Sequence, residues 1–174
     1  KSGESIWVSD FEMHYKGNGS VDLAQLGSNF QESFKRIWHG DAEDDKFNSL
    51  ILSAKLSWKQ ISMIRAYARY LRQIQFNLSE QYIQDCLAEN EDIVKYLVDL
   101  FEYKHDIKKQ DHALSHIEDI EKEIDKKLDT LQNIDDDRIL RKFLEVIIAT
   151  VRTNYFQLDE DTGECKSYIS LKLN

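Results

Sequence analysis

The sequence predicts a mainly α protein, an irregular multi-helix domain with a short strand at each end. Through most of the chain, apolar residues recur at intervals of three and four, which is the spacing of one face of an α-helix. Near both ends they alternate with polar residues instead, as in a strand that is buried on one side. None of the 174 residues is a proline, so no predicted helix is forced to break.

Two elements are predicted in the first 40 residues. Residues 6–15 favour a strand, which needs a partner either in the C-terminal strand or in a sheet outside this chain. After a glycine-containing turn, Ser20 or Asp22 is placed to cap a helix that ends near Gly40. The apolar face of this helix consists of Leu23, Leu26, Phe30, Phe34 and Ile37.

Four closely spaced helices are predicted between residues 45 and 105. A short helix is expected over residues 45–54. Ser57 and Gln60 form a capping box that opens a longer helix, which reaches about residue 75. Two further helices are expected after Ser79. The inner face of the longer helix consists of Trp58, Ile61, Ile64, Ala68 and Leu71.

The last third of the chain predicts two helices and a strand. Residues 110–133 have a narrow apolar seam among charged residues, which suits packing against a single partner helix. Residues 138–154 form a more apolar pattern, so we expect this final helix to be more buried. Residues 167–173 alternate between polar and apolar residues and predict a strand.

Charge and cysteine content exclude several classes of function. The formal net charge of −9 would repel a nucleic acid unless the basic residues were segregated on one face. No apolar run reaches the roughly 18 residues that span a bilayer, and the first residues lack the apolar region of a signal peptide. Cys86 and Cys165 are too few for a disulfide framework. We therefore expect a cytoplasmic protein with no nucleic acid and no membrane among its partners.

Two loops suggest ligand sites but fit them poorly. The turn at residues 17–19 lies where a dinucleotide fingerprint would, but the third glycine position is Asp22, whose carboxylate would repel a pyrophosphate. The acidic loop after Asp159 has Glu164 and Ser170 where a calcium loop needs glycine and glutamate. Both segments are better interpreted as turns.

One helix face offers a possible metal pair. His112 and His116 are four residues apart, with Asp119 as a third ligand, but Ala113 stands where a zinc protease needs glutamate. Two solvated histidines on a charged helix are the favoured interpretation. We predict no catalytic, cofactor-binding or metal-binding residue in this chain.

Two groups of polar residues are candidates for contacts between domains. Arginines at spacings of four and three share one helix face, which is either a solvated face paired with acids or a site for an anion or another domain. The second group closes the final predicted helix, where polar side chains could fix the orientation of a following domain. The candidates are Arg65, Arg69, Arg72, Arg152, Asn154 and Tyr155.

Seven short segments of the chain are distinctive as a set. They are AEDDKFN (42–48), LSW (56–58), IRAYARYLRQ (64–73), LVDLFE (97–102), DDRILR (136–141), TVRTNYFQ (150–157) and YISLKL (168–173). In this order, they resemble one family, the very large bacterial NAD-specific glutamate dehydrogenases. The resemblance runs from about residue 6 to residue 173 and is weakest over residues 104–132. The chain departs from the family pattern in lacking prolines near residues 76–77 and 89–91, which are expected to be surface turns.

The resemblance implies a non-catalytic helical segment between an ACT-like region and the catalytic domain. Residues 1–18 would hold the last strand of the ACT-like unit, residues 19–158 a helical linker or scaffold domain, and residues 159–174 a loop and the first strand of the catalytic domain. The parent reaction would convert glutamate and NAD to 2-oxoglutarate, ammonia and NADH. The parent enzyme would bind the NAD, this chain would bind no cofactor, and the family's catalytic residues would lie after Asn174.

On this interpretation the chain's partners are the rest of the parent polypeptide and, in the parent, other subunits of a homo-oligomer. The helical body would position the catalytic domain and the subunits. The alternative is a free-standing helical adaptor that binds another protein through the seam of the helix over residues 110–133.

Overall fold

The computed structural model describes residues 8, 10, 23–108, 113–166 and 168–174, with the side chains of residues 23–26, 113 and 114 left undescribed. The strand predicted over residues 6–15, the turn at residues 17–19 and the caps Ser20 and Asp22 therefore lie outside the described residues. His112 lies outside them too.

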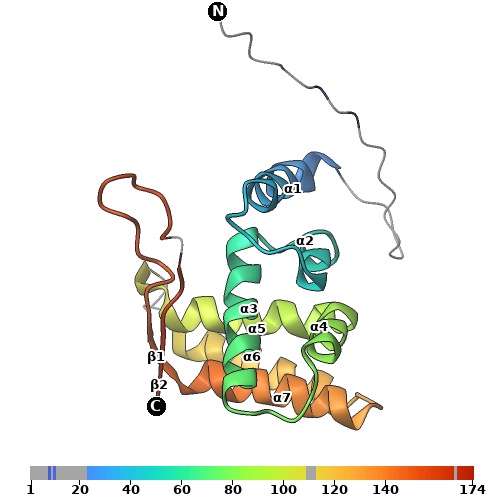
Figure 1. Ribbon diagram of the computed structural model, residues 1–174. Coiled ribbons are helices and arrows are strands. Elements are labelled where there is room, and N and C mark those ends of the chain that lie inside the picture. The colour runs from blue at the N-terminus through green and yellow to red at the C-terminus, as the bar shows by residue number, and fades with distance from the viewer. Residues whose placement is uncertain (1–7, 9, 11–22, 109–112, 167) are drawn as a thin grey trace, which may run out of the picture.

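The described chain is mainly α-helical, which confirms the predicted fold class. Figure 1 shows α3 crossing the layer formed by α5, α6 and α7, with α1 and α2 at one end of α3 and the two strands beside it. The elements are α1 (Leu23–Trp38), η1 (Lys46–Ser49), α2 (Leu50–Ser53), α3 (Trp58–Gln73), α4 (Glu80–Glu89), α5 (Glu91–His105), α6 (Ala113–Leu128), α7 (Ile134–Ala149), β1 (Thr150–Thr153) and β2 (Leu171–Leu173).

Side-chain caps define where several helices begin. The capping box predicted for α3 is present: the Ser57 hydroxyl accepts from the Gln60 amide, and the Gln60 side chain accepts from the Ser57 amide. The Ser79 hydroxyl caps α4, and the Asn133 side chain caps α7. A short polar residue thus ends the loop before each of these helices. The chain depends on such residues because it has no proline to mark these boundaries.

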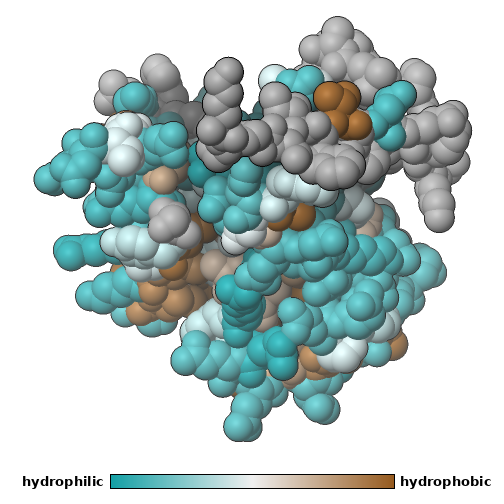
Figure 2. Space-filling view, turned by 45° about the horizontal axis from the view of Figure 1, so that its top comes forward, coloured by the Kyte–Doolittle hydropathy of each residue, from teal (hydrophilic) through white to brown (hydrophobic). Residues whose placement is uncertain are grey.

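The face of the molecule in Figure 2 is mostly hydrophilic, with hydrophobic residues in separate smaller patches. On α1, the rings of Phe30, Phe34 and Trp38 stack on one another, and Trp38 is 71% exposed.

Within the described residues, no helix is both long and apolar enough to cross a membrane.

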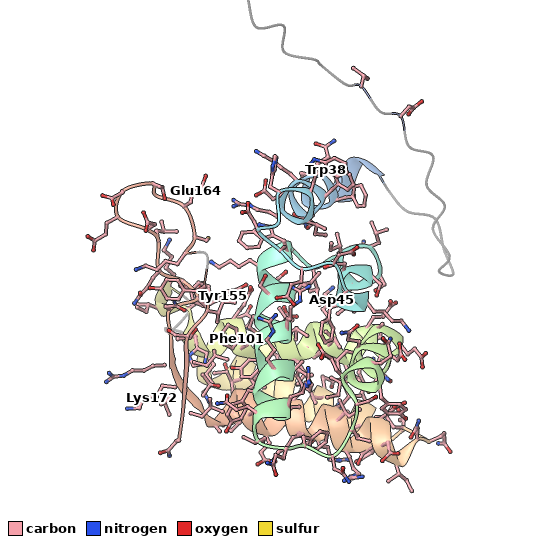
Figure 3. The ribbon with its side chains drawn as sticks, in the orientation of Figure 1. Trp38, Asp45, Phe101, Tyr155, Glu164 and Lys172 are labelled. Atoms are coloured by element: carbon pink, nitrogen blue, oxygen red, sulfur yellow. The ribbon has the colours of Figure 1, made fainter. Side chains whose placement is uncertain are left out.

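The prediction of a helix over residues 138–154 was wrong at its C-terminal end, because α7 ends at Ala149 and the chain continues as β1. Three of the four β1 residues are β-branched, which lowers helix propensity and favours a strand. β1 pairs with the strand predicted at the C-terminal end, and Figure 3 shows Tyr155 and Phe101 between this pair and α3. The antiparallel register joins Thr150 to Leu173, Arg152 to Lys172 and Thr153 to Leu171.

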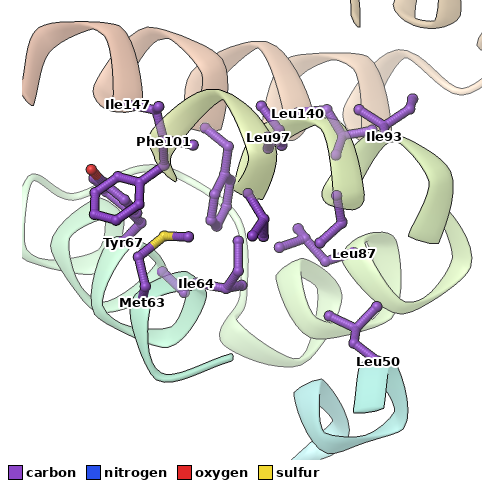
Figure 4. Close-up of a cluster of buried hydrophobic side chains, with 14 of the residues drawn as sticks. Leu50, Met63, Ile64, Tyr67, Leu87, Ile93, Leu97, Phe101, Leu140 and Ile147 are labelled. Carbon is purple, nitrogen blue, oxygen red and sulfur yellow. The ribbon is translucent and has the colours of Figure 1, made fainter. Parts of the chain in front are cut away.

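One hydrophobic core runs through α2, α3, α4, α5, α6 and α7. Figure 4 shows labelled side chains of this core from α2, α3, α4, α5 and α7. Phe101 packs edge-on against Tyr67 at 6.0 Å between ring centroids. α6 packs along α5 and contributes Ile124 and Leu128, in agreement with its narrow seam. Trp58, expected on the inner face of α3, is only half-buried, with the Arg36 guanidinium 4.8 Å from its ring centre.

A buried hydrogen bond joins α3 to the junction of α7 and β1. Tyr67 Oη lies 2.7 Å from Thr150 Oγ1, and the Thr150 hydroxyl already donates to the Val146 carbonyl. The Tyr67 hydroxyl is therefore the donor to Thr150. Burial raises the pKa of Tyr67 well above its ordinary value, so the phenol keeps its proton.

This hydrogen bond predicts non-additive effects in a double-mutant cycle, in which the second substitution restores part of the stability that the first one removes. Thr150→Val leaves the buried Tyr67 hydroxyl without an acceptor and should cost about 1–3 kcal/mol in the free energy of unfolding, measured with urea. Tyr67→Phe should cost about 1 kcal/mol. The double variant, in which both partners are apolar, should be more stable than Thr150→Val alone; additive losses would contradict the assignment.

Candidate functional site

Arg65 does not lie on a solvated stripe; it is buried against the segment that precedes α2. Its guanidinium donates to both carboxylate oxygens of Asp45, at 2.5 and 2.9 Å, and to Asn48 Oδ1 at 3.2 Å. Asp45 also accepts from the Phe47 amide and so caps η1. A buried arginine with a two-pronged carboxylate partner is held in one geometry, so this pair fixes η1 against α3.

The other two arginines of the predicted group are exposed and paired within the chain. Arg69 contacts the Glu43 carboxylate, and Arg72 contacts that of Glu80 at the start of α4. All three arginines of this helix face are thus paired with carboxylates, Arg65 at its buried end and Arg69 and Arg72 at its solvated end. Their role as contacts to another domain remains a prediction.

The second predicted group lies where the strand pair joins the helices. Asn154 is buried and bridges the two chain segments, because its Nδ2 donates to the Tyr168 carbonyl and its Oδ1 accepts from the Ser170 amide. Arg152, in contrast, is exposed on β1 opposite Lys172. Of this predicted group, Asn154 therefore holds two segments of the chain together, whereas Arg152 faces outward; their role in fixing a following domain remains a prediction.

Tyr155 belongs to a network that sequence reasoning missed. Its hydroxyl donates to Glu102 Oε1 at 3.1 Å, and the Gln60 side chain donates to the same oxygen at 3.0 Å. Burial, reinforced by the Glu102 carboxylate, raises the pKa of Tyr155 above its ordinary value. Gln60 thereby caps α3 and connects it through Glu102 of α5 to the segment after β1. The capping box was the only sequence signal for this network.

Lys59 covers the outer side of the same aromatic cluster. Its ammonium lies 4.4 Å from the centre of the Tyr155 ring and 3.2 Å from Cys165 Sγ. Cys86 is the buried thiol, and burial next to Asp136 raises its pKa, which makes it a poor nucleophile.

The residues of the other predicted ligand sites have structural partners. His116 packs against the Tyr103 ring at 5.3 Å between centroids. The Asp159 carboxylate accepts from the amides of Asp161 and Thr162, which form a turn and lower the pKa of Asp159. Among the described residues, no three histidine, cysteine, aspartate or glutamate side chains are grouped to hold a metal ion.

His105 is a titratable group that the sequence did not indicate. It ends α5, packs on Phe101 at 4.9 Å between ring centroids, and its buried Nε2 has no hydrogen-bond partner. Burial, followed by the neighbouring Lys104 ammonium, lowers the pKa of His105 to about 4. The imidazole is therefore neutral in the folded protein at neutral pH.

These features describe a helical body in which most of the named charged side chains form ion pairs, helix caps or hydrogen bonds at a strand junction. Two family models match the sequence. Residues 42–107 match "Glutamate dehydrogenase, helical motif 3", and residues 123–174 match "Bacterial NAD-glutamate dehydrogenase, catalytic domain".

Relatives extend the similarity over nearly the whole chain. It is 40% identical over 173 residues to the NAD-specific glutamate dehydrogenase of Halomonas elongata, 39% over 178 residues to that of Pseudomonas aeruginosa, and 38% over 180 residues to that of Mycobacterium tuberculosis. At least 99% of this chain is covered each time, but it spans only 11% of the length of each relative. The sequence belongs to the bacterial NAD-specific glutamate dehydrogenase family, as one segment of it.

The Arg65 pair predicts a large difference between two charge-removing substitutions. Asp45→Asn keeps a capping oxygen but removes the two-pronged carboxylate partner of the buried Arg65, whose remaining counter-charge is the half-exposed Glu43 carboxylate at 3.8 Å, so it should cost about 3–5 kcal/mol in the free energy of unfolding. Glu80→Gln removes only the exposed Arg72 pair and should cost less than about 1 kcal/mol. Urea unfolding of both variants measures the difference, and equal losses would mean that Arg65 is solvated.

His105 predicts a loss of stability in mild acid. Its pKa is about 4 when folded and about 6.5 when unfolded, so the unfolded chain binds more protons in this window. The free energy of unfolding should fall as the pH drops from about 6.5 to about 4. His105→Gln should flatten this part of the profile in urea titrations. Equal profiles for His105→Gln and the unsubstituted protein would refute the shift.

Proposed function

We propose that this chain acts as a helical segment of an NAD-dependent glutamate dehydrogenase, which oxidises glutamate to 2-oxoglutarate and ammonia while NAD takes the hydride. The observation that supports this most directly is 38–40% identity to three such enzymes along at least 99% of the chain. The parent enzyme would bind NAD and carry the catalytic residues elsewhere in the polypeptide. This chain would contribute positioning.

The positioning role follows from how the strand pair is attached. β1 begins at the residue after α7, and the Thr150 hydroxyl holds that point against α3 through Tyr67. Lys104 of α5 donates to the last carbonyls of α7, those of Ile147 and Ile148. Asn154 and Tyr155 then fix the next residues. A segment with this many buried attachments transmits its orientation to whatever follows it, because packed cores deform little.

The proposed organisation has three parts, with residues 1–18 in an ACT-like unit, 19–158 as the helical scaffold and 159–174 leading into the catalytic domain. The proposed partners are the rest of the polypeptide and, in the parent, further copies in a homo-oligomer in the cytoplasm. Arg69 and Arg72, which are exposed, are the members of the arginine group that could reach such a neighbour.

The positioning role predicts a kinetic defect from a residue that touches no substrate. In the full-length enzyme, Asn154→Ala removes both hydrogen bonds between the segment after β1 and the segment before β2. We expect kcat for glutamate oxidation to fall about 10- to 100-fold, since misplacement by about 1 Å has effects of this size. The measurement is steady-state NADH formation.

Two controls separate positioning from misfolding. Lys142→Gln removes an exposed pair with Glu145 on α7 and should leave kcat unchanged. Circular dichroism at the assay temperature must show Asn154→Ala folded. A folded variant with normal kcat would remove the positioning role. A native gene product of 20.5 kDa, measured by intact mass, would instead leave a free-standing helical adaptor.

A further inference from the structure

Two cations face each other across the strand pair without a counter-charge. Arg152 of β1 is the register partner of Lys172 of β2, so both side chains lie on the same side of the sheet. Like charges in this arrangement repel each other and destabilise the pair. Both side chains are exposed, and neither forms an ion pair with any described residue. Lys172, labelled in Figure 3, lies on the strand pair away from α3.

The same two residues line a hollow of about 560 Å³ with a cationic wall. Lys104 and His105 from the end of α5 complete it on the helix side, and Gln157 and Ser170 add polar groups. None of the described residues that line this hollow is acidic. In a chain with 32 acidic and 23 basic residues, three cations without a carboxylate are an unusual local composition.

The cations differ in how far the protein compensates them. Lys104 donates to the Ile147 and Ile148 carbonyls, where it offsets the negative end of α7, although burial lowers the pKa of Lys104. No such partner exists for Arg152 or Lys172 among the described residues. The free charge of the hollow therefore comes from the two strand residues, while Lys104 is held as part of the wall.

We propose that this hollow binds the phosphate group of a small anion between Arg152 and Lys172. A phosphate dianion matches two uncompensated cations better than a single carboxylate does. The planar guanidinium of Arg152 can bind two phosphate oxygens at once, and Lys172 supplies a point charge. The hollow is within the size range of small-molecule sites and is larger than inorganic phosphate needs. A phosphorylated metabolite or free phosphate would share this chemistry.

The rigidity of the hollow's frame supports a formed site. Asn154 closes the loop between the strands through its two hydrogen bonds, and the bulge between Thr150 and Arg152 sets the direction of the arginine. Bulges often redirect a side chain at a functional site. This proposal does not rest on the dehydrogenase function, because it uses only the strand register, the charges and the lining of the hollow.

The proposal predicts opposite effects of one substitution with and without phosphate. In the purified full-length protein, Lys172→Gln relieves the repulsion and should raise the melting temperature of the strand region slightly in chloride. Inorganic phosphate, at matched ionic strength, should raise the melting temperature of the unsubstituted protein. This gain should be lost in Lys172→Gln and in Arg152→Gln. Calorimetric titration with phosphate should show binding at least about tenfold weaker in both variants.

A matched control removes non-specific effects of phosphate, which stabilises many proteins by exclusion from their surface. Lys142→Gln removes a half-buried lysine that has an acidic partner, so it should keep the full phosphate-dependent gain. Tighter binding of ADP than of phosphate, lost in the same two variants, would identify a phosphorylated metabolite as the ligand. Equal gains in all four proteins, or no saturable binding to the unsubstituted protein, would overturn the proposal.

Discussion

The hydrogen bond between Tyr67 and Thr150 lies where the helical body changes into the strand pair. It joins the middle of α3 to the first residue of β1, inside a cluster that includes Phe101. Because this site is buried, both hydroxyls must be satisfied by protein groups, and Thr150 satisfies its own hydrogen through Val146. The hydrogen bond thereby holds the residue at which α7 gives way to β1 against the middle of α3.

The sequence predicted the helices well because their signals are local. Apolar spacing indicated α1, α3, α5 and α7, and the Ser57–Gln60 capping box located the start of α3. β1 was missed because the apolar pattern of α7 continues up to Thr150, and only a partner 20 residues further on makes the strand favourable. The sequence could not show that Arg65 is buried, and placed it on a face that is either solvated or in contact with an anion or another domain, for a similar reason: its partner Asp45 comes from another element. Such pairings depend on tertiary structure, which spacing cannot show.

The two regions matched by the family models share one core. The first ends at residue 107 in the segment after α5, and the second begins at residue 123 within α6. α6 nevertheless packs along α5, and α7 contacts α3, α4 and α5. Ile124, Leu140 and Phe143 from the second region are fully buried with Leu97 and Phe101 from the first. If either region folded separately, much of this apolar surface would be exposed. The two matched regions therefore pack as one unit, although they are separate in the sequence.

Most arginines of the molecule form ion pairs that stabilise the fold, whereas the cations on the strand pair do not. Several arginines have carboxylate partners, which folding alone explains in a chain with an excess of acids. Among them are Arg65, Arg69, Arg72, Arg138 and Arg141. Arg152 breaks this rule and lies opposite Lys172 on the adjacent strand, where the repulsion works against a two-stranded sheet that is already marginal. Local rules are violated mainly where function compensates for the cost. The phosphate site proposed for the hollow would compensate for this cost, while the hydrogen bond between Tyr67 and Thr150 holds the first residue of β1 against α3.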